Sequence, residues 1–316
     1  MKLVNQLSEI THDRNSVVTV GTFDGMHLAH QELLREVVQR AKRRNGRAVV
    51  VTFEPHPREV VGNHKGVPIL TTLREKQEIA AALGVDLFFT IAFDYAFSRL
   101  TAREFYLEYL VKGIGVSEIV EGYDHHFGRD REGSIEEMLR LGKEFGYSSV
   151  AVQEFVVHSQ VVSSTAIRDL LVNGDVEGAA QLLGRPYSLN GSVVKGDMRG
   201  RTLGFPTANL QLESEKKLVP KNGIYFVEVG ISEKKLAGIA SIGVRPTFAT
   251  DGRRVIEVYI LDFQNDIYGT NLRIALRKRL RDEIRFSSTE ELINQMRLDK
   301  TESIRLRNEY LNLKQN

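Results

Sequence analysis

Residues 21–30 read GTFDGMHLAH and directly follow a short β-branched run, SVVTV, at residues 16–20. The run predicts a buried strand, and the two glycines allow the chain behind it to turn tightly. A helical pattern comes next, because leucine, valine and alanine recur on one face of residues 31–44. A strand, a glycine-rich turn and a helix are typical of an α/β fold, in which ligands bind beyond the carboxyl ends of the strands.

The alternation of strand and helix continues towards residue 184. We expect further strands at residues 48–53, 87–93, 118–121 and 149–154, and further helices at residues 73–83, 102–112, 135–145 and 165–172. The run at 48–53, AVVVTF, is apolar throughout except for one threonine, as expected for a strand that is buried on both faces of a parallel sheet. Repeated βα units predict a doubly wound parallel sheet with right-handed crossovers.

The pattern changes after Gly184. Short β-rich runs broken by glycine follow at residues 189–194, 224–230, 236–242, 255–263 and 272–280. Their spacing predicts an antiparallel barrel or sandwich, and residues 289–311 read as a terminal helix. We therefore expect two domains, residues 1–184 and 185–316.

Composition narrows the class of protein. Apolar residues make up 42% of the 316 residues and charged residues 27%, which is usual for a globular protein. No apolar run reaches the roughly 20 residues of a membrane span, and the N-terminus lacks the apolar core of a secretory signal. The absence of cysteine excludes disulfides, thiolate metal sites and a cysteine nucleophile. We expect a cytoplasmic protein that does not contact membranes.

The charge balance gives no general attraction for nucleic acid. The formal net charge is +2, from 43 basic and 41 acidic residues. Two basic runs, at residues 40–44 and 277–281, are short enough to be solvated helix ends or strand edges. We expect no nucleic-acid partner.

Two histidines stand at the start of the first helix. His27 and His30 are three residues apart, so they project from the same side of its first turn. A helix N-terminus offers free N–H groups and a positive dipole end, and Gly21 and Gly25 let a ligand approach the backbone. The pair could bind phosphate oxygens, or it could be two capping or core histidines.

Three later segments are candidates for the same edge of the sheet. Residues 162–168, VSSTAIR, place three hydroxyls at a second helix start with Arg168 one turn inside. Such a set can clamp a polyphosphate, or it can be a plain N-cap with a surface arginine. Residues 52–57, TFEPHP, and 122–129, GYDHHFGR, both follow expected strands. None of these segments is a Walker A or G-x-G-x-x-G loop, which argues against a P-loop kinase or a dehydrogenase.

The densest stretch of the second domain is GDMRGRTLGFPTANL, at residues 196–210. Its three glycines and two arginines suit close backbone approach to phosphates together with charge neutralisation. Thr207 and Asn209 supply neutral oxygens that Mg²⁺ carried by ATP can accept. The alternative is a glycine-rich hairpin with ordinary surface arginines.

These motifs together resemble the bacterial bifunctional riboflavin kinase/FAD synthetase family over essentially the whole chain. The family pattern G-x-F-D-G-x-H-x-G-H is similar to residues 21–30, F-x-P-H-P to 53–57, G-x-D-x-x-F-G to 122–128 and S-S-T-x-I-R to 163–168. In the second domain the P-T-A-N motif stands at 206–209, and further similar segments lie at 243–248, 257–263 and 266–269.

The resemblance implies two ATP-dependent reactions. A Rossmann-like nucleotidyltransferase domain would adenylylate FMN to FAD and release pyrophosphate, and a barrel domain with a terminal helix would phosphorylate riboflavin to FMN. ATP and Mg²⁺ would be required, and the partners would be small molecules, with the chain a monomer or a weak homo-oligomer.

The resemblance also implies roles for individual residues. In the first domain, His27 and His30 would stabilise the transition state, with Arg168 as a further catalytic residue. ATP and its phosphates would contact Gly21, Phe23, Asp24, Gly25, Ser163, Ser164 and Thr165, and in the second domain Gly196, Arg199, Gly200, Arg201 and Gly204. Pro55, His56, Pro57 and Asp124 would line flavin or adenine pockets. Thr207 and Asn209 would contact the metal ion, and Glu257 would be the general base.

One position departs from the family motif, because Ala29 stands where its second glycine is expected. We expect the chain to retain adenylylation, although the added methyl group can lower its rate. Two other hypotheses remain. The chain could transfer a nucleotide to a different phosphoester, or it could be a flavin-binding regulator that contacts nucleic acid through the two basic runs.

Overall fold

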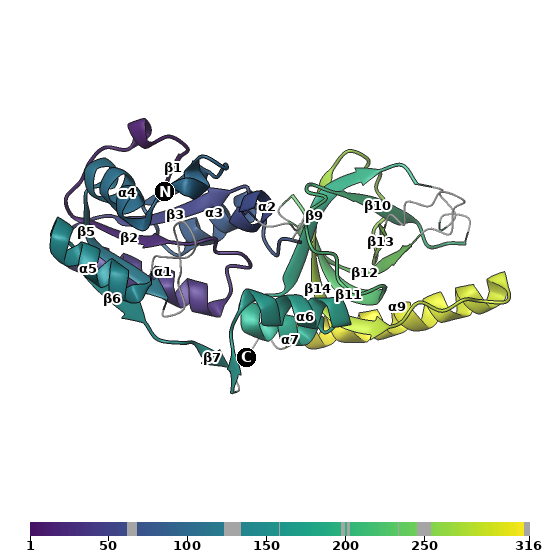
Figure 1. Ribbon diagram of the computed structural model, residues 1–316. Helices are drawn as coiled ribbons and strands as arrows, with labels where there is room; N and C mark the ends of the chain where they lie inside the picture. Colours follow the sequence, from purple (N-terminus) through teal and green to yellow (C-terminus); the bar gives the residue numbers. More distant parts are fainter. Residues whose placement is uncertain are drawn as a thin grey trace. The chain divides into compact units, whose positions relative to one another are not determined.

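The computed structural model describes residues 1–61, 68–122, 134–157, 159–196, 200, 203–232, 234–244 and 254–312. The chain divides into two compact units, Met1–Ser164 and Thr165–Asn316 (Figure 1). The domain boundary that we expect near residue 184 stays a prediction. Each unit is described by itself below.

The first unit contains a six-stranded sheet whose strands are all parallel, in the order β1-β4-β3-β2-β5-β6. Its strands are β1 (Lys2–Val4), β2 (Ser16–Val20), β3 (Ala48–Glu54), β4 (Leu87–Ala92), β5 (Val116–Gly122) and β6 (Ser148–Val152). The chain moves outward in one direction from β2 to β3 and β4, and in the other through β5 and β6. The predicted parallel sheet is therefore confirmed, and its strand order reverses between β2 and β5, where α/β folds bind ligands.

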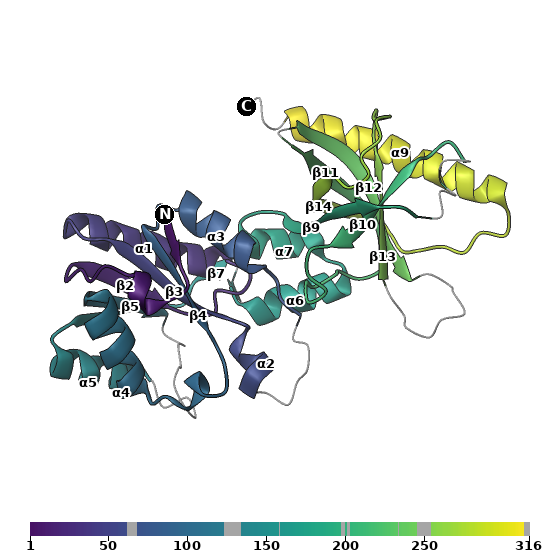
Figure 2. The same ribbon diagram turned by 90° about the horizontal axis from the view of Figure 1, so that it is seen from above.

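Helices cover both faces of this sheet (Figure 2). On one face α1 (Leu28–Arg43) and α3 (Leu73–Ala82) pack on it, and on the other α4 (Ala102–Phe105), the π-helix η3 (Tyr106–Ile114) and α5 (Ile135–Phe145). Alternate residues of one strand enter different cores, since Val50 packs with α1 and Val51 with η3. Shorter elements are η1 (Leu7–Glu9), α2 (Pro57–Val61), η2 (Phe97–Arg99), β7 (Val156–Val157) and β8 (Gln160–Val161).

The second unit begins within α6 (Ser164–Asn173), which is followed by α7 (Val176–Leu183). Both helices are tied to the strands that follow them. The backbone N–H of Lys221 donates to the carbonyl of Leu171 at 3.0 Å, and α7 packs against two barrel strands. The start of the β pattern in the sequence therefore comes later than the start of this unit.

The strands of the second unit form a closed antiparallel barrel in the order β10-β13-β12-β11-β14-β9. They are β9 (Tyr187–Val194), β10 (Thr207–Leu212), β11 (Gly223–Ile231), β12 (Lys234–Val244), β13 (Arg254–Ile260) and β14 (Asn271–Arg281). The terminal helix α9 (Thr289–Asn312) runs along the barrel (Figure 1). Of the two architectures expected from the sequence, the barrel is confirmed, and β10 is a strand where we expected only a loop.

Candidate active sites

The loop after β2 has an unusual backbone. Phe23, Gly25 and Met26 adopt φ values of 47°, 87° and 40°, in the left-handed region that residues with a side chain rarely occupy. Gly21 makes room for this turn, because a Cβ there would lie 3.0 Å from the ring of Phe23. Backbone held in such conformations is frequent at ligand sites. The loop lies at the carboxyl end of β2, where the strand order reverses.

Asp24 fixes this loop to the segment that precedes α3. Its carboxylate is 1% exposed and accepts hydrogen bonds from the backbone N–H groups of Leu70 and Thr71, at 2.8 and 3.0 Å to Oδ1. The hydroxyl of Thr71 in turn accepts from the N–H of Gly25 at 2.9 Å. Any phosphate contact of Asp24 would therefore involve its backbone rather than its side chain. Our sequence reasoning missed Leu70 and Thr71, since a pair 46 residues apart leaves no periodic signal.

The two histidines stack on each other at the start of α1. Their ring centroids are 3.6 Å apart with 17° between the planes, and the ring of Phe23 meets His30 edge-on. His27 is the N-cap, and its Nδ1 accepts the backbone N–H of His30 at 3.4 Å. A neutral His27 ring therefore carries its proton on Nε2. His27 therefore caps the helix, and this contact defines which of its nitrogens can donate to a ligand.

The segment after β3 lies next to this loop. Gly21 N–H donates to the carbonyl of Val51 at 3.0 Å, so the chain leaves β2 alongside β3. Pro55 follows a cis peptide bond, and His56 Nδ1 accepts the N–H of Arg58 at 3.2 Å. Pro57 then begins α2. The segment thus follows β3 at the same sheet edge as the loop after β2, while its contact with a flavin stays a prediction.

One hydroxyl of the predicted polyphosphate clamp reaches the same loop. Ser164 Oγ donates to the carbonyl of Asp24 at 2.8 Å, and Ser163 precedes it at the start of α6. Thr165 and Arg168 belong to the second compact unit, so their roles towards the histidines stay predictions. Asp124 lies outside the described residues.

In the second unit, glycines make room for the side chains of the P-T-A-N segment. A Cβ at Gly196 would lie 2.1 Å from Nδ2 of Asn209. At Gly200 it would lie 2.4 Å from the carbonyl oxygen of Phe205 and 3.2 Å from Oγ1 of Thr207. The two glycines are therefore required by close packing against this segment. Gly204 has φ 81° with nothing within 4 Å of its Cβ position, which indicates a turn. Arg199 and Arg201 lie outside the described residues.

Asn209 and Glu257 lie opposite each other on neighbouring strands. Asn209 of β10 pairs with Glu257 of β13, and Thr207 pairs with Tyr259 two residues further along. Val258, between Glu257 and Tyr259, is 1% exposed and points into the barrel, so its neighbours point to the outer face. Directly opposed side chains have Cβ atoms about 5 Å apart. The structure thus brings the predicted general base next to one predicted metal ligand. Tyr259 is a neighbour that sequence reasoning missed.

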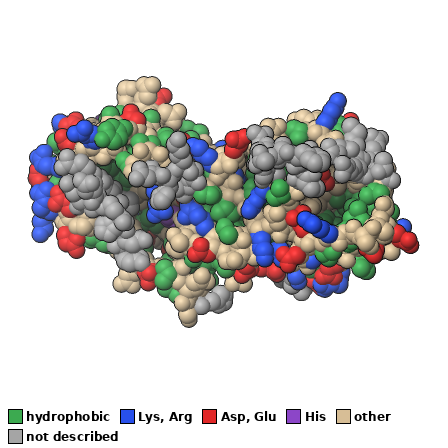
Figure 3. Space-filling model, turned by 45° about the vertical axis from the view of Figure 1, so that its right-hand side comes forward, with side chains coloured by type: hydrophobic (Ala, Val, Ile, Leu, Met, Phe, Trp, Pro, Cys, Tyr) green, Lys and Arg blue, Asp and Glu red, His purple; other side chains and the backbone are tan. Residues whose placement is uncertain are grey.

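Two arginines of the basic run at the end of α1 are paired with acidic groups. Arg40 forms ion pairs with Glu36 and Glu118, at 2.6 and 3.0 Å, and Arg44 reaches Glu118 at 3.1 Å. Figure 3 shows Lys and Arg side chains interspersed with Asp and Glu side chains on the face in view.

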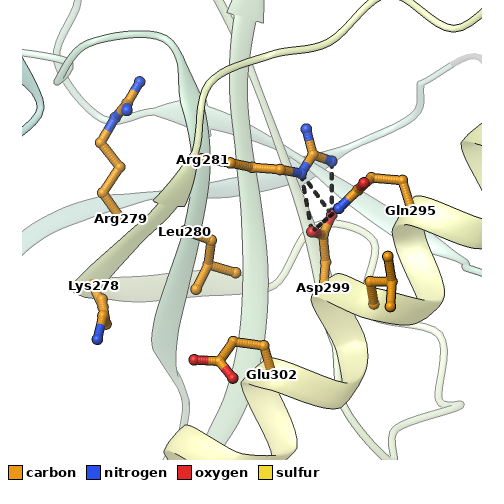
Figure 4. A pocket seen from close by; sticks show the side chains of 8 residues that line it. Lys278, Arg279, Leu280, Arg281, Gln295, Asp299 and Glu302 are labelled. Carbon is orange, nitrogen blue, oxygen red and sulfur yellow. Dashed lines mark hydrogen bonds and ion pairs between the residues drawn. The ribbon is translucent and has the colours of Figure 1, made fainter.

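Three arginines of the second basic run are also paired. Ion pairs join Arg277 to Glu228, Arg279 to Asp282 and Arg281 to Asp299. Arg281 and Asp299 line a pocket of about 230 Å³ between β14 and α9 (Figure 4). That volume is below the roughly 300 Å³ at which small-molecule sites begin, so we do not assign flavin to it.

Two family models match the chain in the order that the folds suggest. The model described as FAD synthetase matches residues 9–166, and the one described as riboflavin kinase matches residues 183–306. A protein of Escherichia coli strain K12, named bifunctional riboflavin kinase/FMN adenylyltransferase, is 39% identical over 302 residues, 95% of this chain and 96% of its own. The chain belongs to the bifunctional riboflavin kinase/FAD synthetase family.

Further relatives cover nearly the same length. A Listeria monocytogenes protein of the same name is 39% identical over 92% of both chains. A solved structure described as a macrolide-efflux protein from Streptococcus pneumoniae has a TM-score of 0.86 and 33% identity, over 95% of this chain and 97% of that one. The family models and the curated relatives agree with each other, and they decide the family.

None of the described helices is long and apolar enough to cross a membrane. Nor do three or more histidine and acidic side chains gather into a metal site in the part of the chain that the structure describes.

Proposed function

We propose that the chain makes FAD from riboflavin in two steps. The barrel unit would transfer the γ-phosphoryl group of ATP to riboflavin, giving FMN and ADP. The parallel-sheet unit would then transfer AMP from a second ATP to FMN, giving FAD and pyrophosphate. The observation that carries this proposal is the presence of two sites, each within the residues that one family model matches.

In the first unit, His27 and His30 would stabilise the transition state of AMP transfer. Negative charge grows on the phosphate oxygens as the pyrophosphate leaves, and preorganised donors aimed at those oxygens lower the barrier. The Nδ1 contact of His27 leaves its Nε2–H to donate. The N-terminus of α1 adds backbone N–H groups and the positive end of the helix dipole. Asp24 would act by shaping the loop, because its carboxylate holds Leu70 and Thr71.

In the second unit, Glu257 would take the proton of the terminal hydroxyl of riboflavin as the phosphoryl group is transferred. A positioned carboxylate contributes roughly 10²–10⁴ to such a rate. Thr207 and Asn209 fit Mg²⁺ that ATP brings with it, since two neutral oxygens suit an ion held mostly by phosphates and waters. The ion would offset the charge of the phosphates during transfer. Gly196, Gly200 and Gly204 would let ATP approach the backbone.

The ion pairs of several arginines in the two basic runs weaken the hypothesis of a nucleic-acid-binding regulator. Arg40, Arg277 and Arg281 each have an acidic partner. Neutralised arginines offer little of the counterion release that drives nucleic-acid binding. We propose riboflavin, FMN and ATP as the partners, and the cytoplasmic location and the oligomeric state remain predictions.

Separate assays of the two half-reactions test the proposal. The wild type should convert FMN and ATP to FAD and pyrophosphate, and riboflavin and ATP to FMN and ADP. The variant His27→Asn should lose about 10²–10³ in the first rate, the usual effect of one transition-state donor, and keep the second. Equal FAD formation by the variant and the wild type would remove His27 from the mechanism.

A further inference from the structure

Lys76 is a buried lysine close to the loop at residues 21–27, and it does not belong to any of the sequence motifs. Lys76 is only 3% exposed and lies one turn inside α3. Ala80, four residues later, is fully buried and packs with Val50 and Phe88 of the sheet. Residues i and i+4 share a helix face, so Lys76 also faces the sheet.

Lys76 lies towards the end of the sheet that carries the candidate site. α3 begins directly after Leu70 and Thr71, which bind the Asp24 carboxylate, so its first turn is at the carboxyl ends of the strands. Two carboxylates act on Lys76: Asp24 from the loop after β2, and Glu54 from the end of β3. Burial lowers the pKa of Lys76 below 10.5, and the attraction of Asp24 and then of Glu54 opposes this shift.

A buried carboxylate at the candidate phosphate site is unfavourable for the binding of an anion. Asp24 is 1% exposed, and its negative charge lies in the loop that is to receive a polyphosphate. Charges interact strongly where water is excluded, so an uncompensated carboxylate would repel the incoming phosphates. Removing Asp24 is no remedy, because its two backbone hydrogen bonds hold the loop. A buried cation nearby allows the loop to keep the carboxylate and still bind an anion.

We propose that Lys76 is a positioning residue for AMP transfer, whose ammonium balances the Asp24 carboxylate and so lets the loop at residues 21–27 bind polyphosphate. The inference rests on the proposed function of the first unit. It adds a residue that acts through Asp24, and does not require Lys76 to touch the substrate.

Four variants of the full chain test this inference: Lys76→Met, Lys76→Arg, Asp24→Asn and the double variant Lys76→Met/Asp24→Asn. The assay is FAD formation from FMN, with KM for ATP and kcat measured separately. Riboflavin phosphorylation by the same chains reports on the other unit, and Lys143→Met, an exposed lysine of α5, is the matched control. We expect Lys76→Met to raise KM for ATP at least tenfold and Lys76→Arg to change it less than threefold.

The double variant separates charge balance from packing. If Lys76 acts through Asp24, removing the carboxylate as well should restore part of the ATP affinity that Lys76→Met loses. Single effects that multiply in the double variant would overturn the inference, as would equal losses in Lys76→Met and Lys76→Arg, or no loss in either. Equilibrium dialysis of the same variants with inorganic pyrophosphate measures anion affinity without turnover. A failure of the proposed function is therefore distinguishable from a failure of this inference.

If Lys76→Met does not fold, the pH dependence of FAD formation tests the inference instead. A lysine with a lowered pKa is charged below that pKa and neutral above it, whereas the guanidinium of Lys76→Arg stays charged. The titratable groups that act on Lys76 are Asp24 and Glu54. The ratio of FAD formation by Lys76→Arg to that by the wild type should therefore rise at alkaline pH, before the ordinary lysine pKa of 10.5 is reached. A flat ratio would overturn the inference.

Discussion

Glu257, the residue that we propose as the general base, has neighbours from two adjacent strands. It lies on the outer face of β13, paired with Asn209 on one side and with Ser241 of β12 on the other. A glutamate in this setting has polar neighbours on both strands. The position combines a carboxylate with oxygen atoms that suit a nucleotide-bound metal ion, which the sequence alone could not place together.

Replacing Glu257 by glutamine should lower FMN formation from riboflavin by about 10²–10⁴, because glutamine cannot take a proton. Conversion of supplied FMN to FAD should be unchanged. Chromatography of the flavins measures both rates. Glu215→Gln, an exposed change in the same unit, is the control and should leave both rates intact. A full rate of FMN formation by Glu257→Gln would exclude it as the base.

Ala29 is the residue at which this chain departs from the motif of its family. It lies in the first turn of α1, directly before His30 in the sequence. Restoring glycine removes a methyl group near the phosphate site and costs at most about 1 kcal/mol of helix stability. We expect Ala29→Gly to form FAD at an equal or higher rate than the wild type in an initial-rate assay. A clear loss of rate would mean that the pocket has been reshaped to contain the methyl group.

At the level of whole elements, the glycines before β10 leave room for side chains of that strand. Gly196→Ala would force a Cβ to within 2.1 Å of the amide of Asn209, so Asn209 must move. We expect this variant to lose riboflavin phosphorylation and to keep FAD formation from FMN. Gly230→Ala in β11 is the matched control, since its new Cβ would meet no atom closer than 3.6 Å. Retained phosphorylation in Gly196→Ala would contradict the role of Asn209.

Most elements could be predicted from the sequence, because the burial of their apolar side chains requires a regular local spacing. The apolar run at 48–53 became β3 with one added residue, and the helix at 135–145 is found with the same bounds. β10 was missed although Ala208 and Leu210 point inward and Thr207 and Asn209 outward, since the glycines beside it dominated the interpretation. The π-helix η3 falls where we expected an α-helix, because both bury a similar apolar stripe.

The candidate sites were predicted less completely than the fold. The motifs located His27, His30 and Glu257, yet the sequence gives no sign of the contacts that orient them. The carboxylate of Asp24 binds residues 46 and 47 positions away, and Asn209 meets Glu257 from a different strand. Such contacts follow from the way the chain folds back on itself, which no local pattern records.

For the molecule as a whole, we propose that a single chain carries two ATP-dependent sites that act in sequence on a flavin. The two family models cover separate parts of the chain, and each of the two units contains a candidate site. The order of the reactions follows from chemistry, since FMN is the product of the second unit and the substrate of the first.

The most direct test is a time course of the pure protein with riboflavin, ATP and Mg²⁺, in which chromatography follows riboflavin, FMN and FAD. The account predicts that riboflavin falls, FMN rises first, and FAD then forms at the expense of FMN with release of pyrophosphate. FMN that accumulates without FAD would contradict the role of the first unit. The absence of any flavin product would contradict the account as a whole.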